Sequence, residues 1–109
     1  MEKTKNTSAV KYKIAQDYKY LDDDYWDWWV WIEGSEKHLD AIKSVTYTLH
    51  HTFPDPVRTK TNRKNKFKLK TAGWGVFTIY ARINFKTATH IELEHELELR
   101  YPEGTKNND

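Results

Sequence analysis

Apolar and polar side chains alternate one by one along several segments of this chain. The clearest case is residues 90–101, where glutamates alternate with apolar residues and one histidine. Residues 25–33, YWDWWVWIE, place only apolar residues at the even positions. A period of two is typical of a β-strand with one buried face, and no segment shows the period of a helix of ordinary length. The alternation therefore predicts an all-β protein.

About seven short strands account for most of the chain. The expected strands cover residues 10–20, 25–33, 42–50, 57–61, 66–71, 77–85 and 90–101, with one helical turn at 36–40. Antiparallel strands at this spacing predict a β-sandwich or a barrel. We expect a single domain over 10–101, with polar, disordered tails at 1–9 and 102–109.

Composition excludes several classes of protein. The 109 residues include no cysteine, so neither a disulfide framework nor a thiolate metal site is available. No apolar run has the length of a membrane span, and the opening MEKTKNTS lacks the apolar core of a signal peptide. We therefore expect a soluble, cytoplasmic domain with no membrane segment.

Charge is unevenly distributed although the net charge is only +2. Seven cations and no acid lie between Arg58 and Lys70, whereas acids gather at 22–24 and along 92–98. We interpret the basic and acidic segments as solvated outer faces and as cross-strand neighbours. No nucleic-acid partner is expected.

Two tryptophans occupy the polar side of the strand at 25–33. Trp29 and Trp31 lie at odd positions, so they are expected on the outer face. Something should cover them: the N-terminal segment, a partner chain in an oligomer, or an additional domain.

Catalytic and metal sites are not expected. His50 and His51 are adjacent on what we expect to be extended chain, so they should point to opposite faces. His95 falls on the apolar face of the last strand and is expected to be a hydrogen-bonded core residue. No nucleophile elbow or phosphate-binding glycine loop is present. The chain is predicted not to be an enzyme and to need no cofactor.

Two loops each present one large aromatic residue beside small or rigid neighbours. Phe53 lies in the loop 50–56, whose prolines should hold Phe53 and Asp55 extended, and Trp74 lies in the loop 72–76. Loops at one end of a sandwich converge, so the two rings could form a slot for a flat or apolar group. The rings could equally plug the end of the core.

Four pieces of this sequence carry a family resemblance. They are DWWVWIEG at 27–34, VTYTLHHTFPDPVR at 45–58, GWGVF at 73–77 and HELEL at 95–99. In this order and spacing the chain resembles a YEATS domain, particularly the prokaryotic branch. The resemblance implies an immunoglobulin-like antiparallel β-sandwich of about seven to eight strands. It also implies a module that binds an acylated lysine, such as acetyl- or crotonyl-lysine, on a protein or peptide.

The resemblance assigns roles to particular residues. Phe53 and Trp74 would sandwich the acyl chain, Thr52 would bind the acyl amide, and His50 would orient the loop. The backbone N–H of Trp74 or Gly75 would hold the acyl oxygen. Where the family has a further aromatic residue, this chain has Asp24, so either Tyr25 takes that place or the cage is open on that side. The alternative is an interaction domain of a bacterial signalling or defence protein without acyl-lysine recognition, which docks through the outer tryptophans.

Overall fold

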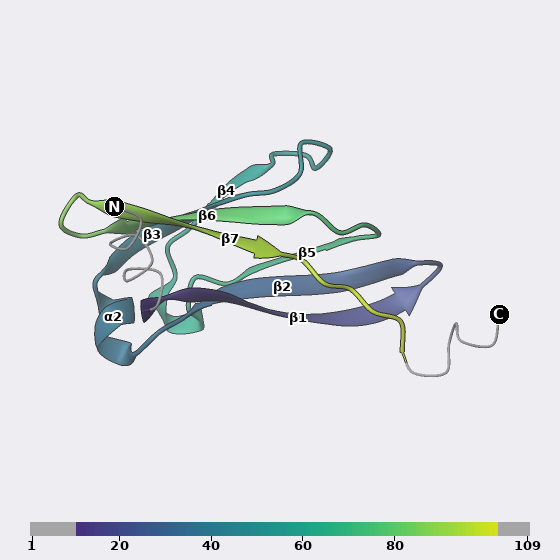
Figure 1. Cartoon of the computed structure of the whole chain (residues 1–109), viewed down its shortest axis with the longest axis horizontal. Helices are drawn as coiled ribbons and strands as arrows, with labels where there is room; N and C mark the ends of the chain where they lie inside the picture. The colour runs from purple at the N-terminus through teal and green to yellow at the C-terminus, as the bar shows by residue number, and fades with distance from the viewer. Residues whose placement is uncertain (1–10, 103–109) are drawn as a thin grey trace.

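The chain folds into two antiparallel sheets packed face to face (Figure 1). The structure, a computed structural model, describes residues 11–102. The three-stranded sheet contains, in spatial order, β1 (Lys13–Asp22), β2 (Tyr25–Glu33) and β5 (Leu69–Gly73). The four-stranded sheet contains β4 (Val57–Lys60), β3 (Ile42–Thr48), β6 (Thr78–Phe85) and β7 (His90–Glu96). The predicted immunoglobulin-like β-sandwich is confirmed, with seven strands in the described residues.

Two short helices complete the described part of the chain. Helix α2 (Glu36–Asp40) follows β2, and the 3-10 turn η1 (Arg63–Asn65) lies between β4 and β5. Among residues 11–102, no helix has the length and hydropathy needed to cross a membrane. The expected tail at 1–9, and all but Pro102 of the tail at 102–109, lie outside the described residues.

The core lies between the sheets and follows the alternation of the sequence. In β2 the even residues Trp26, Trp28, Val30 and Ile32 are all buried. Facing them from the four-stranded sheet are the buried side chains of Val45, Tyr47, Leu49, Ile79, Ala81 and Ile83. Each fully buried large apolar side chain contributes roughly 1.5–3 kcal/mol. This continuous apolar layer holds the sheets together and leaves the loops at the ends exposed.

Local signals place the boundaries of β2 and α2 where we predicted them. Asp23 and Asp24 form the turn before β2, with φ of 54° and 57°, a region that Asp tolerates better than most residues. Ser35 caps α2, because its Oγ accepts a hydrogen bond of 3.1 Å from the backbone N–H of His38. Strands β1 and β3 differ from the expected 10–20 and 42–50: β1 runs to Asp22, and β3 ends at Thr48.

The strand predicted at 66–71 begins later than expected. Lys66 and Phe67 have φ of 60° and 59°, so this part of the chain is left-handed and cannot extend a strand. The Phe67 N–H donates to the Asn62 carbonyl (2.9 Å), which closes the turn around η1. Phe67 is nevertheless fully buried, as the alternation predicted. Strand β5 therefore starts at Leu69.

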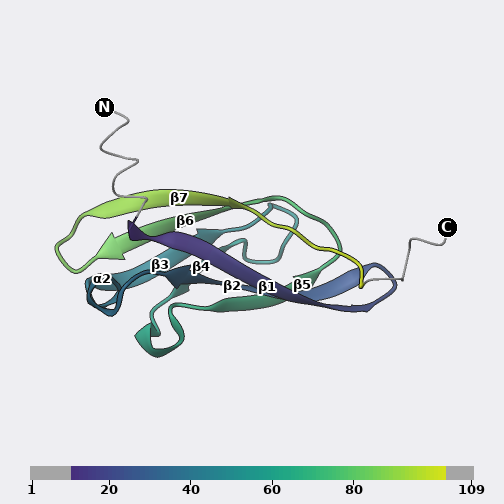
Figure 2. The same ribbon diagram turned by 60° about the horizontal axis from the view of Figure 1, so that its bottom comes forward.

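The last strand ends earlier than the alternation indicated. Pairing with β6 stops at Glu96, and the chain then crosses to the three-stranded sheet (Figure 2). Gln16 of β1 accepts from the Glu98 N–H and donates to the Glu98 carbonyl, both at 2.8 Å. Leu97 remains buried, so the apolar alternation continues although the ladder does not. We call residues 97–102 the C-terminal strap.

His95 joins one edge of each sheet. Its Nε2 lies 2.7 Å from Gln16 Oε1, so β7 and β1 are linked across the sandwich. Because an amide oxygen can only accept, Nε2 carries a proton and donates in this contact. Partial burial lowers the pKa of His95. The predicted hydrogen bond of His95 is confirmed, but the side chain is only half-buried and is not a full member of the core.

The basic and acidic segments are not neighbours, which corrects our expectation. Strand β4 and strand β7 form opposite edges of the four-stranded sheet, with β3 and β6 between them. The carboxylate of Glu92 instead lies 3.6 Å from Arg82 of β6. The positions of these segments in the sequence could not show this. The order of strands in a sheet depends on how the chain connects them, and here it differs from the order in the sequence.

Candidate ligand-binding slot

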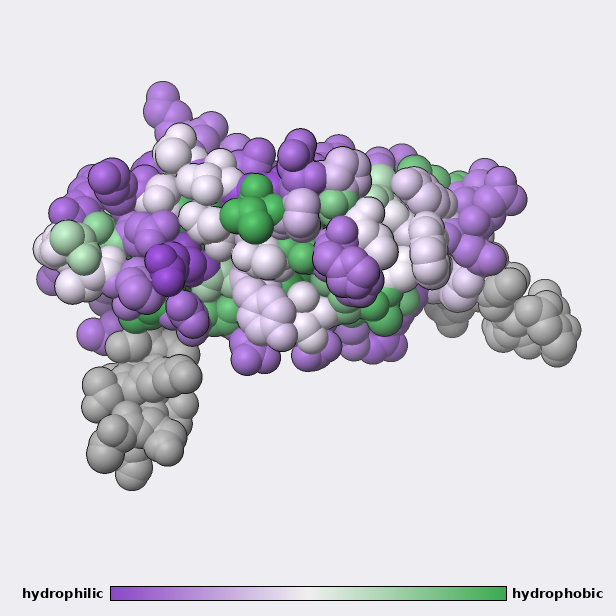
Figure 3. All heavy atoms as spheres, turned by 90° about the horizontal axis from the view of Figure 1, so that it is seen from above, coloured by the Kyte–Doolittle hydropathy of each residue, from purple (hydrophilic) through white to green (hydrophobic). Residues whose placement is uncertain are grey.

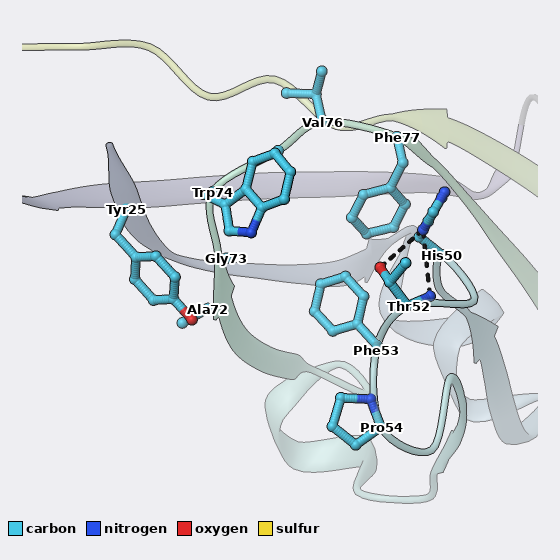
Figure 4. A pocket seen from close by; sticks show the side chains of 11 residues that line it. Tyr25, His50, Thr52, Phe53, Pro54, Ala72, Gly73, Trp74, Val76 and Phe77 are labelled. Carbon is cyan, nitrogen blue, oxygen red and sulfur yellow. Dashed lines mark hydrogen bonds between the residues drawn. The ribbon is translucent and has the colours of Figure 1, made fainter. Parts of the chain in front are cut away.

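A groove of about 420 Å³ lies at one end of the sandwich, where the β3–β4 and β5–β6 loops meet (Figure 4). It is lined by Tyr25, His50, Thr52, Phe53, Pro54, Ala72, Gly73, Trp74, Gly75, Val76 and Phe77. All six residues that we predicted from the resemblance are among them. We call this groove the slot.

The β3–β4 loop is held by its own backbone and by one arginine. The Leu49 N–H donates to the Pro56 carbonyl (2.8 Å) across the loop base. Arg58 donates from Nε to the Asp55 carbonyl and from Nη2 to the Pro54 carbonyl, both at 2.9 Å. Asp55 has a φ of 49°, so our prediction that it is extended was wrong. These bonds fix the segment that presents Phe53.

His50 and Thr52 form a polar pair beside the slot. The Thr52 N–H donates to His50 Nδ1 at 3.3 Å, so Nδ1 is an acceptor. The Thr52 hydroxyl, 2.9 Å from the same nitrogen, is then the donor of that contact. Its oxygen keeps its lone pairs for a further donor. Thr52 is exposed, so this acceptor is available to a ligand N–H group.

The two histidines do not point to opposite faces as predicted. The rings of His50 and His51 are stacked, with centroids 4.3 Å apart and an angle of 30° between their planes. The prediction assumed extended chain, but the chain turns at 51–52. Within residues 11–102, no group of three or more His, Asp or Glu side chains is arranged to hold a metal ion.

Phe53 and Trp74 differ in how far they contribute to the core. Phe53 is half-buried and packs against Phe77, with ring centroids 5.3 Å apart. Trp74 is 76% exposed, so it does not plug the end of the core. Figure 4 shows the two rings projecting from different loops toward one space, with Thr52 and His50 on the Phe53 side. An exposed indole opposite a supported phenyl ring can hold a flat group between them.

The inner end of the slot is formed by three closely packed groups. A Cβ added to Gly73 would lie 3.5 Å from the Phe53 ring and 3.7 Å from Trp28 Nε1. That Nε1 is buried and has no hydrogen-bond partner among the described residues. A Cβ at Gly75, in contrast, would meet nothing within 4 Å. A side chain at position 73 would thus be in van der Waals contact with Phe53 and Trp28, whereas the space at Gly75 is open.

Tyr25 forms a side wall of the slot. It is 42% exposed and lies on the opposite side of Trp74 from the His50–Thr52 pair (Figure 4). Asp24, where the resemblance implied an aromatic residue, faces elsewhere: its carboxylate accepts from the Tyr101 hydroxyl at 2.6 Å. Tyr25 therefore lines the slot, and its role as the further aromatic residue remains a prediction.

Sequence reasoning did not assign five of the lining residues to the slot: Pro54, Ala72, Gly73, Val76 and Phe77. Phe77 matters most, because its ring lies 5.9 Å from that of Trp28 and 6.0 Å from that of His50. We had included it only as the first residue of the strand expected at 77–85. The sequence signal that could have assigned Phe77 to the slot is its place in the GWGVF motif, directly before β6 (Thr78–Phe85).

The outer tryptophans are covered in part by their own chain. Trp29 and Trp31 are half-buried. The Lys70 ammonium lies 5.3 Å from a Trp29 ring centroid, and Trp31 Nε1 donates to Glu33 (2.7 Å). An oligomer or domain contact through these rings remains a prediction.

A second depression, of about 640 Å³, lies on the outer face of the four-stranded sheet. Its walls include Thr46, Thr48, Tyr80 and the Arg82–Glu92 ion pair. Figure 3 looks onto this sheet and shows a mostly hydrophilic surface with small hydrophobic patches. The slot, with opposed aromatic rings and a free acceptor, is the better ligand site.

Comparison with known proteins identifies the family of this chain. The family model of the prokaryotic YEATS domain matches residues 26–98, which include every slot residue except Tyr25. The chain belongs to the prokaryotic YEATS family. A solved structure described as the Yaf9 YEATS domain recognizing an H3K122suc peptide is similar to this YEATS domain, with 26% identity and a TM-score of 0.63. The match covers 81% of this chain and 70% of that one.

Two curated fission-yeast proteins are also similar. The Protein AF-9 homolog of Schizosaccharomyces pombe is 29% identical over 105 residues, or 92% of this chain and 44% of that protein. Transcription initiation factor TFIID subunit 14 of the same organism is 44% identical over 45 residues, or 41% of this chain and 18% of that protein. This YEATS domain thus spans less than half the length of either relative.

Proposed function

We propose that this YEATS domain is an acyl-lysine-binding module, not an enzyme, that holds the acylated side chain between Phe53 and Trp74. The observation that carries the proposal is the exposed Trp74 ring, which shares an open groove with the supported ring of Phe53. The similarity to a YEATS domain that recognizes an H3K122suc peptide supports it. Acetyl- and crotonyl-lysine are the ligands we propose here.

Acylation changes lysine into a group that suits the slot. A free ammonium loses hydration when it enters an apolar groove, whereas a neutral, planar amide loses much less. The planar amide stacks between the rings, and its N–H donates to the Thr52 hydroxyl oxygen. The acyl oxygen accepts from the backbone N–H of Trp74 or Gly75. His50 keeps the Thr52 hydroxyl turned so that its oxygen faces the ligand.

Arg58 favours the acylated form over the free amine. Aromatic faces attract cations, so two rings alone would not exclude a free lysine. The Arg58 guanidinium carbon lies 6.0 Å from the Phe53 ring centroid. This fixed positive charge repels a second cation at the same ring but leaves a neutral amide unaffected. The slot therefore combines aromatic walls with a charge that opposes unmodified lysine.

A calorimetric titration tests the proposal. Acetyl-lysine and crotonyl-lysine peptides are titrated into the protein, with the unmodified peptide as the ligand control. Acylated peptides should bind and the unmodified peptide should bind much more weakly. Trp74→Ala should weaken binding by roughly tenfold or more. Stacking of a planar group, such as a nucleobase, on one aromatic side chain contributes about 1–3 kcal/mol. Tyr80→Ala removes an aromatic ring that is 52% exposed on the four-stranded sheet, so it is the matched control and should bind normally.

Two results would contradict the proposal. One is a folded protein that binds no acylated peptide; the other is binding that Trp74→Ala leaves unchanged. The second result would favour the alternative, an interaction domain that docks a partner through Trp29 and Trp31. Substituting those two residues would then abolish the interaction.

A further inference from the structure

The basic run of the sequence forms one edge of the folded molecule. β1 and β7 meet on one side of the sandwich through the contact of Gln16 with His95. β4 and β5 are the opposite edges of their two sheets, and the short segment with η1 joins them beside α2 (Figure 1). We call the cations of this run the basic edge: Arg58, Lys60, Arg63, Lys64, Lys66, Lys68 and Lys70.

Most of this charge is not neutralised within the molecule. Among residues 11–102, Arg63 is the only member of the basic edge with a carboxylate at salt-bridge distance, from Glu36 and Asp40. The glutamates of the last strand and strap lie at the opposite edge. The net charge of +2 therefore conceals an uneven distribution, because glutamates of β7 and the strap pair with Arg82 and Arg100 while most cations of the basic edge have no carboxylate at salt-bridge distance. A partner at the basic edge needs negative charge.

The basic edge is continuous with the slot. β5 ends at Gly73, and both Ala72 and Gly73 line the slot. Lys70 precedes Gly73 by three residues, which is about 10 Å along a strand. From β4, Arg58 holds the loop of Phe53 and lies close to its ring. A chain that places one side chain in the slot can therefore extend along the basic edge.

We infer that the basic edge binds an acidic, extended segment of the ligand. This segment flanks the acylated lysine in the ligand's sequence. The inference rests on the proposed function and specifies the sequence around the modified residue. β5 pairs with β2 on one side and with no strand of residues 11–102 on the other. Its free edge can accept an extended peptide by main-chain pairing, while Lys68 and Lys70 contact acidic side chains of the ligand.

A peptide suits this edge better than a nucleic acid does. Recognition of single-stranded nucleic acid uses exposed aromatic rings for base stacking. The only aromatic residue of the run, Phe67, is fully buried. The row of glutamates at the far edge would repel a phosphate backbone that wraps around this small domain.

Lysines on edge strands also protect proteins against aggregation, because their charges oppose pairing with the sheet edge of another molecule. Protection alone predicts no preference among ligands with different flanking charges. Binding of an acidic segment predicts a preference that depends on Lys68 and Lys70 and that salt weakens. The two roles are separable by experiment.

The test uses three peptides of equal length with one central acetyl-lysine, flanked by Asp and Glu, by Ser and Gly, or by Lys and Arg. Fluorescence anisotropy at low salt should show the acidic peptide binding about 5- to 20-fold more tightly than the neutral one, as expected for two or three surface ion pairs. Lys68→Glu with Lys70→Glu should abolish this preference and keep binding of the neutral peptide. Lys11→Glu with Lys86→Glu makes the same charge change at exposed positions outside the run and should keep the preference.

The outcomes distinguish a failure of this inference alone from a failure of the proposed function. Equal binding of all three acetylated peptides would leave the slot intact and overturn the role of the basic edge. Equal binding of acidic peptides with and without the acetyl group, or tighter binding of a single-stranded oligonucleotide, would also overturn it. Failure of every acetylated peptide would overturn the proposed function and this inference together.

Discussion

At the residue scale, the two rings of the slot have different structural roles. Phe53 contacts Trp28 and Phe77 at the end of the core, with ring centroids 6.2 and 5.3 Å away. Trp74 is 76% exposed. Binding and stability should therefore respond differently to the loss of each ring.

Phe53→Ala is predicted to lower the free energy of unfolding by about 1–3 kcal/mol, because it removes a half-buried aromatic contact. Trp74→Ala should change it by less than about 0.5 kcal/mol, as most exposed substitutions do. Both variants should lose acyl-lysine binding. Urea unfolding measures the stability difference, and equal losses would mean that Trp74 is packed into the fold.

Neither the packing nor the backbone conformation requires a glycine at position 75. A Cβ there meets nothing within 4 Å, and the residue does not require a positive φ. Gly75→Ala is predicted to leave stability unchanged or to raise it by about 0.4–1 kcal/mol through the unfolded state. The added methyl group narrows the slot, so affinity should fall more for crotonyl- than for acetyl-lysine.

Gly34→Ala is the matched control for that prediction. Its Cβ would lie 3.2 Å from the Lys11 carbonyl oxygen, a tight contact with backbone. It should lower the melting temperature and leave the ratio of the two affinities unchanged. The same ratio in wild type and Gly75→Ala would show that the acyl chain does not pass Gly75.

At the element scale, the C-terminal strap connects the two sheets and reaches the wall of the slot. Gln16 binds both backbone groups of Glu98, and Trp26 Nε1 donates to the Arg100 carbonyl (2.9 Å). Tyr101 then binds Asp24, the neighbour of Tyr25, and this hydrogen bond raises the pKa of Tyr101 to about 12. The strap thus fixes the turn before the slot wall.

Gln16→Ala is predicted to release the strap. It removes the bonds to Glu98 and to His95, so the free energy of unfolding should fall by about 1–2 kcal/mol. Hydrogen exchange of the Glu98 amide should accelerate well beyond that of amides in β6. Lys19→Ala, an exposed change on the same strand, should do neither. Unchanged exchange at Glu98 would show that Gln16 does not hold the strap.

At the scale of the whole molecule, the imidazole of His95 is one of the groups that link the two sheets on one side, together with the Gln16–Glu98 hydrogen bonds. Burial lowers the pKa of His95 below its ordinary value of 6.5 in the fold. The unfolded chain therefore binds a proton more readily than the folded one. The stability associated with neutral His95 is complete above about pH 6.5 and is lost as the pH falls toward the lowered pKa.

We predict that acidification below about pH 6.5 reduces the free energy of unfolding. His95→Gln keeps an N–H group for Gln16 but does not titrate, so its stability should depend less on pH over this interval. Denaturant unfolding of both proteins at several pH values measures the difference. Parallel pH profiles would show that His95 is not the group responsible.

The sequence by itself determined the elements whose signals are local. The bounds of β2 and α2 follow from alternation, from the Asp turn and from the Ser35 cap, all of which act within a few residues. Period two also identified the buried faces of β2, β3, β6 and β7. The loop aromatics Phe53 and Trp74 were identified by their rigid or small neighbours, and the family resemblance paired them.

The tertiary structure decided what depends on residues far apart in the chain. It ended β7 at Glu96, because contacts with Gln16 of β1 draw the following segment to the other sheet. It left Trp74 exposed, so that the two loops form a slot and not a plug. It also put the basic and acidic segments on opposite edges of the sandwich. Alternation fixes which face of a strand is buried, but only packing between the sheets fixes which strands and loops become neighbours.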